Sequence, residues 1–444
     1  MRDEKESQQV LSAVLAAAKK VEPKAEVFAE LSSKRQANTR FARGEIISTG
    51  DATDEEVTVE LSLGQRHASS STNQTDPASL RALVERTARL ARLAPEDPER
   101  MPVLGAQLHA RVPAAYDEAT GKLGAEARAD AVRAAVAEGE AKSLDMTGFY
   151  ELTAETSAQA SSAGLRAYHA GTLASFTLTA RRPDGQGSGW AGAHSERASE
   201  LRPAELAKVA AEKAALSANP RRLEPGRYTV VLEPAAVGEL LQFLCNSLQA
   251  RTADEGRSFF SKPGGGTRVG EKLFADGVTL RSDPANPALP SRPYDPDGFP
   301  LKPTTWIENG TLKQLAYSRY WASKQGKAPT GEPFAFQLDG GQASREELIA
   351  GVKRGVLITR FWYTRWVDPQ SMLITGLTRD GVFLIEDGKI AYPVNNFRFN
   401  ESPVNMLAKA DGIGRETVRA SASFTRAPAL RTHEFNLASI SEAI

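Results

Sequence analysis

Four turn-forming dipeptides divide the C-terminal half of the chain into strand-like runs. They are Asp276-Gly277, Asn309-Gly310, Asp380-Gly381 and Asp387-Gly388, with flanks such as KLFADGVTLRS and GVFLIEDGKIAYPV. Asn-Gly and Asp-Gly pairs tolerate the positive φ angles of tight hairpin turns, so each pair predicts two antiparallel strands joined by a short turn. Residues 225–444 are therefore predicted to form a β-rich, largely antiparallel domain. Helices are predicted to interrupt it at 235–250 and 344–352.

The first half of the chain predicts helices that alternate with strands. A helix is expected after Asp76, an N-cap residue, because Pro77 follows it and amphipathic spacing then continues to about residue 94. Further helices are predicted at 5–21, 124–144 and 202–218 from the spacing of their apolar residues. Strands are predicted at 25–32, 55–71 and 146–180, a Pro-rich linker at 95–105 and an exposed loop at 181–196.

These patterns together predict an α+β fold in three parts. N-terminal α/β units come first, as an α+β domain at 1–110 and a middle α+β domain at 111–224. The β-rich, largely antiparallel domain at 225–444 follows them. A length of 444 residues agrees with two or three domains, since about 150 residues is typical of one.

Composition excludes several classes of partner. Lys+Arg and Asp+Glu are both 55, so the chain has no global positive field that would gather nucleic acid. The longest apolar runs, such as VLSAVLAAA, are shorter than the ~20 residues that span a bilayer. The first residues, MRDEKESQQ, are polar where a signal peptide would be apolar. We therefore expect a cytoplasmic protein that binds neither nucleic acid nor membrane.

Histidine and cysteine usage argues against a metal site. The chain has one cysteine, Cys245, which lies in an apolar helical pattern and is predicted to be buried. No histidine occurs between Ser195 and Thr432, so a histidine ligand or base is excluded from nearly all of the C-terminal domain. The acids there, such as Asp339, Asp368 and Asp380, are more typical of solvated turns than of a catalytic site. The five histidines are scattered, without a second ligand at metal-binding spacing: His67, His109, His169, His194 and His433.

The segment LITRFWYTRWVDP combines aromatic residues with arginines. Strand alternation would place Trp362 and Trp366 on one face with Arg360, and Phe361 and Tyr363 on the other. Aromatic residues on both faces favour a strand buried between two layers. The alternative is an interface or a peptide-binding groove, because Trp, Tyr and Arg dominate binding hot spots. Arg360, Trp362 and Trp366 are therefore candidate peptide- or interface-binding residues.

Several segments, in their order and spacing, resemble the TldD/PmbA family, long called modulators of DNA gyrase. In the N-terminal part these are RFARGEI and DPASLRALVERTARLARLA. In the C-terminal part they are GRYTVVLEPAAVGELLQFL, WIENGTLKQLAYSRYWASKQGKAPTG, GVFLIEDGKIAYPVNNFRFNESP and ADGIGRETVRA. The resemblance covers nearly the whole chain.

The resemblance implies a zinc metalloprotease fold whose metal site is degenerate in this chain. TldD-type members carry His-Glu-x-x-x-His on the helix after the strand similar to YTVVLEP, and a cysteine further on. Aligned by the resemblance, these positions hold Gln242, Phe243, Ser247 and Glu416. Phe243 cannot act as a base, and Gln242 and Ser247 are poor zinc ligands. We therefore expect no catalytic residue, no metal and no cofactor in this chain.

This pattern resembles PmbA-type (TldE-type) members, which pair with a zinc-containing TldD-type subunit. The implied function is that of a non-catalytic subunit in a protease complex acting on unfolded peptides, in peptide maturation or antitoxin degradation. The implied dimer contact lies in the β-rich C-terminal half. A homodimeric peptide-binding or scaffold protein is the main alternative. An enzyme with a carboxylate-based site is a third possibility, which a cluster of acids in the dimer cavity would favour.

Overall fold

The structure, a computed structural model, describes residues 1–420 and 424–442, and its N-terminal half is built on one sheet. This six-stranded sheet has the order β3-β2-β1-β4-β5-β6, and every neighbouring pair is antiparallel. Both predicted N-terminal units contribute three strands to it, while the predicted domain boundaries remain predictions. The strands are β1 (Glu26–Ala42), β2 (Glu45–Leu63), β3 (Arg66–Thr72), β4 (Asp145–Ser161), β5 (Arg166–Arg181) and β6 (Ser188–Ser195).

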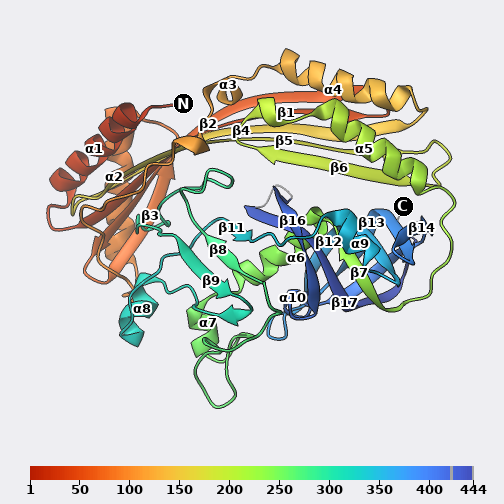
Figure 1. Ribbon diagram of the computed structural model, residues 1–444. Coiled ribbons are helices and arrows are strands. Elements are labelled where there is room, and N and C mark those ends of the chain that lie inside the picture. The colour runs from red at the N-terminus through yellow and green to blue at the C-terminus, as the bar shows by residue number, and fades with distance from the viewer. Residues whose placement is uncertain (421–423, 443–444) are drawn as a thin grey trace.

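Four long helices cover one face of this N-terminal sheet (Figure 1). Helices α1 (Glu4–Val21) and α2 (Pro77–Leu93) form one hydrophobic cluster with β1 and β2, around Leu11, Leu31 and Val59. Helices α4 (Ala125–Glu140) and α5 (Pro203–Leu216) form a second cluster with β4, β5 and β6. The predicted N-cap at Asp76 is confirmed, because its carboxylate accepts hydrogen bonds from the backbone of residues 78 and 79. The short elements nearby are α3 (Glu118–Gly121) and the 3₁₀ turns η1 (Pro113–Ala115) and η2 (Ala198–Glu200).

The opposite face of the N-terminal sheet is polar and turns toward the C-terminal half (Figure 1). Side chains alternate between the two faces of a strand, so the apolar positions of β1 lie under the helices and the intervening positions face the other way. The intervening positions include Glu30, Ser32 and Lys34 on β1, with Glu155 and Ser157 on β4. We call this surface the inner face of the N-terminal sheet.

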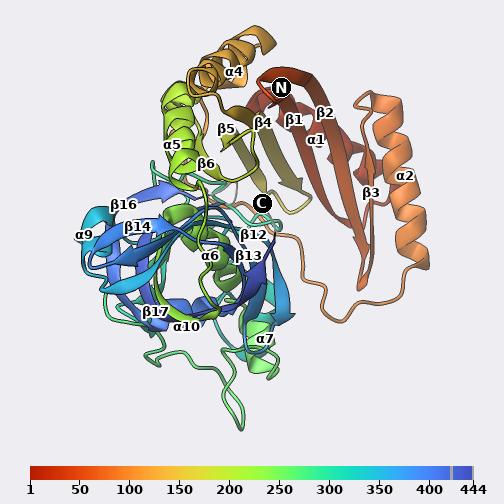
Figure 2. The same ribbon diagram turned by 90° about the vertical axis from the view of Figure 1, so that its right-hand side faces the viewer.

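The C-terminal half contains an 11-stranded sheet, part of which closes on itself. Strand β7 (Gly226–Leu232) pairs with both β12 (Arg354–Asp368) and β17 (Thr425–Ser441). Through β13 (Leu373–Glu386) and β15 (Asn396–Glu401) the ring returns to β17, so five strands enclose one core (Figure 2). Most pairs are antiparallel, while β12–β7 and β11–β17 are parallel. The predicted α+β fold, with a largely antiparallel C-terminal domain, is confirmed.

Shorter elements complete the C-terminal half. Helices α6 and α10 pack against strands of the ring. The helices are α6 (Pro234–Asn246), α7 (Ala250–Asp254), α8 (Arg319–Gln325), α9 (Arg345–Ala350) and α10 (Pro403–Ala408). The strands are β8 (Leu280–Ser282), β9 (Thr304–Glu308), β10 (Thr311–Leu312), β11 (Phe336–Leu338), β14 (Lys389–Pro393) and β16 (Ala410–Arg419).

Three predictions from glycine positions are wrong. The predicted exposed loop at 181–196 contains strand β6, whose glycines allow close packing under α5: a Cβ at Gly189 would collide with the backbone oxygen of Ala210. Asp380-Gly381 does not join two strands but lies inside β13, where both residues have positive φ and the pairing with β12 shifts register. The dipeptide forms a β-bulge there, because the positive φ angles that suit a hairpin turn also suit a bulge. Asp276-Gly277 does not join two strands either, because no described strand directly precedes it and β8 begins only at Leu280. Asn309-Gly310 and Asp387-Gly388 do form the predicted hairpin turns.

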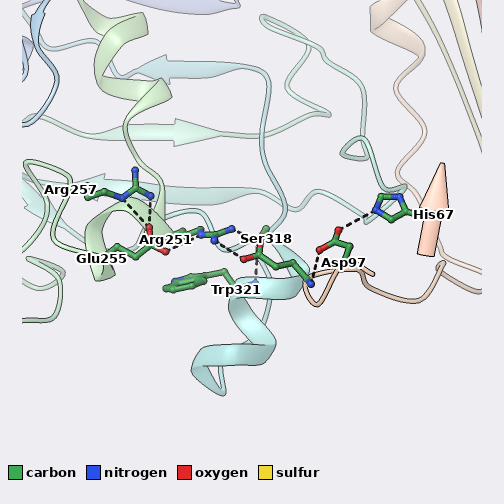
Figure 3. A network of polar contacts seen from close by, with 8 residues as sticks. His67, Asp97, Arg251, Glu255, Arg257, Ser318 and Trp321 are labelled. Carbon is green, nitrogen blue, oxygen red and sulfur yellow. Dashed lines mark hydrogen bonds and ion pairs between the residues drawn. The ribbon is translucent and has the colours of Figure 1, made fainter. Parts of the chain in front are cut away.

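A polar network fastens the predicted linker at 95–105 to both halves (Figure 3). Arg251 of α7 donates to both carboxylate oxygens of Glu99, at 2.6 and 2.7 Å. Asp97 accepts from the Glu99 backbone and lies 3.1 Å from His67 Nε2 on β3. The guanidinium of Arg251 also lies over the Trp321 ring. The linker is thus a docked connection between the N-terminal sheet and the C-terminal half.

In the described part of the chain, we find no helix with the length and hydropathy needed to cross a membrane.

Candidate functional site

Helix α6 and its C-cap residue, Ser247, carry three of the four positions at which the sequence predicts degenerate metal ligands. The helix begins after Glu233, and its buried side, including Leu240, Leu241 and Leu244, packs into the C-terminal core. Glu233 is itself fixed by Lys213 at 2.6 Å and Arg345 at 2.9 Å, so the helix start is tied to α5 and α9. The buried side explains the apolar pattern in the sequence. The opposite side of α6 is the candidate site.

The side chains on this opposite side are engaged with their own helix or with strand β12. Gln242 Nε2 donates to the Glu239 backbone oxygen at 3.1 Å, and Ser247 Oγ donates to that of Phe243 at 2.8 Å. Phe243 makes an edge-to-face contact with Trp366, with ring centroids 5.0 Å apart. Thr364 of β12 donates to Glu239. Strand β12 therefore covers the helix face on which a catalytic metal would need an open position.

These residues do not fit a zinc ion. Phe243 offers no donor atom, and the Ser247 hydroxyl and the Gln242 amide are neutral oxygen or nitrogen groups in place of the thiolate, imidazole or carboxylate that zinc favours. Glu416, the remaining position, is exposed on β16. In residues 1–420 and 424–442, no three His, Cys, Asp or Glu side chains gather as a metal site. Cys245 is buried as predicted, and burial raises the pKa of its thiol.

Residues 360–366 of β12 do not follow the alternation of faces that the sequence predicts. Phe361 is buried against Phe399 and Phe435, whereas Trp362 is 41% exposed and Tyr363 is 65% exposed. Tyr363 has a positive φ of 57°, and the pairing with β13 shifts between Trp362 and Arg365. This bulge rotates the strand and turns the remaining aromatic side chains outward. The preferred interpretation, a strand buried between two layers, is therefore wrong for residues beyond Phe361.

A cavity of about 390 Å³ lies between the inner face of the N-terminal sheet and the C-terminal half. Arg292 reaches Glu30 at 3.7 Å and lies over the Phe334 ring, and Arg419 pairs with Glu196. Two of the three carboxylates that line the cavity are thus neutralised by arginines, and the third is Glu155. This arrangement does not supply the cluster of free acids that a carboxylate-based enzyme would need.

Two histidines on the inner face are held neutral. His169 lines the cavity, and burial, reinforced by the charge of Arg292, lowers its pKa to about 4. Burial and the charge of Arg419 also lower the pKa of His194 to about 4. Neither ring nitrogen of His194 has a hydrogen-bond partner among the described residues. Sequence reasoning placed these histidines on scattered elements and missed that strand pairing brings them to one face.

We expect the free energy of unfolding to fall as the pH decreases from about 6.5 to about 4. A histidine whose pKa is depressed in the folded protein stays neutral there but binds a proton on unfolding, so acid favours the unfolded chain. Each of His169 and His194 is expected to contribute about 2 kcal/mol. Burial raises the pKa of Asp295 to about 6, which offsets part of the loss because this carboxyl binds its proton more readily when folded.

Urea denaturation across this pH window measures the effect. The variant His194→Gln should flatten the pH dependence. His67→Gln serves as a control, because His67 is partly exposed and faces Asp97. Unchanged pH dependence in His194→Gln would contradict the assignment.

Three family models match the chain in order. They are described as PmbA/TldA metallopeptidase domain 1, at residues 25–91, the central domain, at 117–218, and the C-terminal domain, at 225–439. A protein named metalloprotease from Methanothermobacter thermautotrophicus is 29% identical over 227 residues, which is 48% of either chain. The chain thus aligns with between 30% and 48% of the length of three curated relatives that it matches.

Solved structures share the fold over nearly the whole length. TldE from Thermococcus kodakarensis matches with a TM-score of 0.86 and 17% identity, over 96% of this chain and 99% of that one. A proposed modulator of DNA gyrase from Thermotoga maritima matches with a TM-score of 0.83 and 20% identity, over 97% and 99%. At these identities, the likeness is one of fold alone.

Proposed function

The chain belongs to the TldD/PmbA metallopeptidase family, and from this premise we propose that it is a non-catalytic subunit of a TldD-type zinc protease complex. One observation carries the proposal. The helix face that would hold the metal and the general base carries Gln242 and Phe243, and Trp366 packs on Phe243. Zinc hydrolysis needs an open coordination position and a base beside the metal-bound water, and this face provides neither.

A subunit without its own chemistry acts through a partner, and β12 offers a surface for one. Trp362, Tyr363, Trp366 and Val367 are 41%, 65%, 36% and 53% exposed, and they lie together on one segment of the strand. Arg379 lies over the Trp362 ring at 4.3 Å, and Arg365 lies over Tyr363 at 5.6 Å. We call residues 362–367 the aromatic segment. Exposed Trp, Tyr and Arg side chains are typical of interface hot spots.

The partner in this proposal is a TldD-type subunit, which supplies the zinc, and the substrate is an unfolded peptide. Peptide maturation and antitoxin degradation are the processes that the family resemblance suggests. A homodimer that binds peptides without a protease partner is the alternative. The heterodimer and the homodimer would both use the aromatic segment, so identification of the bound partner distinguishes the two proposals.

We expect the purified chain alone to bind no stoichiometric zinc and to hydrolyse no unfolded peptide. Elemental analysis after dialysis against zinc and a casein assay measure the two properties. The positive control is the chain co-purified from its host with whatever protein accompanies it, assayed with and without a chelator. Activity that requires the co-purified protein and disappears with the chelator is the expected result.

Three outcomes would count against the proposal. About one zinc per chain, retained at nanomolar affinity by the chain alone, would overturn the loss of the metal site. Chelator-resistant hydrolysis by the chain alone would favour an unrelated active site. Recovery of a self-associated chain without any protease partner would favour the homodimeric peptide-binding protein.

A further inference from the structure

A second cleft, of about 440 Å³, lies where the inner face of the N-terminal sheet meets strand β12. Arg40, Phe149, Thr177 and Gly192 stand directly opposite one another across β1, β4, β5 and β6, and this row crosses the cleft. Arg360 of β12 lines the cleft from the C-terminal half. The cleft thus lies at the seam between the two halves, a common position for ligand sites.

Trp190 lines this cleft, and Gly192 lies against its ring. The Trp190 ring lies over Gly192, since a Cβ added there would come within 2.6 Å of the Trp190 ring carbon Cζ2. The Arg360 guanidinium lies 5.1 Å from the centroid of the same ring. Glycine at 192 therefore leaves room for the indole against the sheet, where the ring contacts Arg360 of the C-terminal half. Thr147, Thr177 and Thr179 also line the cleft.

The charge of the cleft is positive. Arg40 and Arg360 line it, and no carboxylate is among the described residues that do so. Arg360 pairs with Asp380 at 2.6 Å, whereas Arg40 is exposed and forms no ion pair with a described residue within 4.0 Å. The next row of the inner face carries Glu151, and burial raises the pKa of its carboxyl group. Among the described residues, no ion pair joins Glu151 to Arg40.

A second arginine also faces Asp380, because Arg379 Nε lies 3.8 Å from its carboxylate. Burial lowers the pKa of the Arg379 guanidinium; the charge of Asp380 opposes this shift, and Arg360 and Arg181 add to it. Two arginines, Arg360 and Arg379, thus share one buried acid, and Arg40 lines the same cleft as Arg360, in a chain whose formal net charge is zero. Such a local excess attracts an anion, and arginine beside aromatic rings suits a planar carboxylate.

We infer that this cleft binds a carboxylate group of the peptide handled by the complex, with Arg40 as its main charged contact. The inference rests on the proposed function, because that function supplies the peptide. An acidic side chain and a free C-terminus present the same group, and the experiment below separates them. The cleft would give the complex a preference among unfolded peptides, which the degenerate α6 face does not provide.

Fluorescence anisotropy with four labelled unfolded peptides of equal length tests the inference. One pair contains glutamates and the other contains glutamines at the same positions, and each sequence is made with a free and with an amidated C-terminus. The protein is the purified full chain, alone and in its native complex. We expect at least one carboxylate-bearing peptide to bind about tenfold more tightly than the glutamine-containing amide, which corresponds to about 1.4 kcal/mol.

The variant Arg40→Gln should remove this preference and leave binding of the neutral peptide within about twofold. The matched control is Arg89→Gln, which removes an exposed arginine from α2 on the other face of the sheet and should keep the preference. Loss of the preference on replacing glutamate assigns the site to side chains, and loss on amidation assigns it to the C-terminus. Added salt should weaken the preferred peptide more than the neutral one.

Equal binding of all four peptides would overturn the inference while leaving the proposed function intact. A preference that survives in Arg40→Gln would also overturn it. Arg40-dependent binding of a single-stranded oligonucleotide more tightly than any of the peptides would assign the cleft to phosphate instead. If no peptide binds to the chain or to its complex, the proposed function itself fails, and the inference fails with it.

Discussion

Replacement of Asp380 by asparagine is expected to lower the free energy of unfolding by about 3–5 kcal/mol. The Asp380 side chain is fully buried and accepts two hydrogen bonds from Arg360, at 2.6 and 3.0 Å, while Arg379 Nε lies 3.8 Å away. Removing the negative charge leaves the Arg360 guanidinium in a poorly solvated place without this counter-ion and takes away one attraction of Arg379. Asparagine has the same shape and also tolerates the φ of 54° at this position, so backbone strain does not contribute.

Urea denaturation of the two proteins measures the loss. Asp130→Asn is the matched control, because Asp130 forms only an exposed pair with Arg133 on α4, and such pairs contribute at most about 1 kcal/mol. The double variant Asp380→Asn with Arg360→Met should recover part of the lost stability, because it also removes the guanidinium that has lost this counter-ion. A loss below about 1 kcal/mol in Asp380→Asn would show that water compensates the arginines.

Alanine at Trp362 or Trp366 is expected to weaken association with the partner by about thirtyfold, or about 2 kcal/mol. The two indoles are 41% and 36% exposed, and Trp366 also covers Phe243. Burying such large rings in an interface provides much of the binding energy of a typical hot spot. Sedimentation velocity of the wild type and both variants, with the co-purified partner and alone, measures the association.

A thermal melt of each variant separates the interface from the core. Leu93→Ala is the control, since Leu93 is 83% exposed on α2 and lies outside the aromatic segment. Weakened association with a nearly unchanged melting temperature supports the interface. A lowered melting temperature with intact association would assign both tryptophans to folding alone. A wild-type chain that stays monomeric at high micromolar concentration, with no partner in the host lysate, would refute the dimer.

Local sequence patterns predicted most helices and the main strands because their causes are local. Asp76 and Pro77 specify the start of α2, and the apolar spacing of residues 5–21 specifies α1. Asp387-Gly388 specifies the turn between β13 and β14. The same reasoning failed for β6 and for Asp380-Gly381. In both places glycine is required by a tertiary contact or a bulge, and the sequence alone does not distinguish these from a loop or a turn.

The sequence also determined which functional groups helix α6 does not have. No arrangement in space can convert Phe243 into a base or provide histidines between Ser195 and Thr432, because the side chains themselves are missing. The family resemblance indicated which positions to examine, and the amide of Gln242 and the hydroxyl of Ser247 are poor zinc ligands wherever the fold places them. Composition shows which functional groups a segment lacks, but it does not show which distant residues come together to form a site.

Only the tertiary structure decided which distant residues meet. The pairing of β1, β4, β5 and β6 brings Arg40 and Trp190 to one face, and packing of β12 against that face adds Arg360 from more than 150 residues further along the chain. The outward turn of Trp362 and Tyr363 likewise depends on a bulge in the pairing with β13. Strand register and domain packing arise from the sum of many weak contacts across the whole chain, so no short segment encodes them.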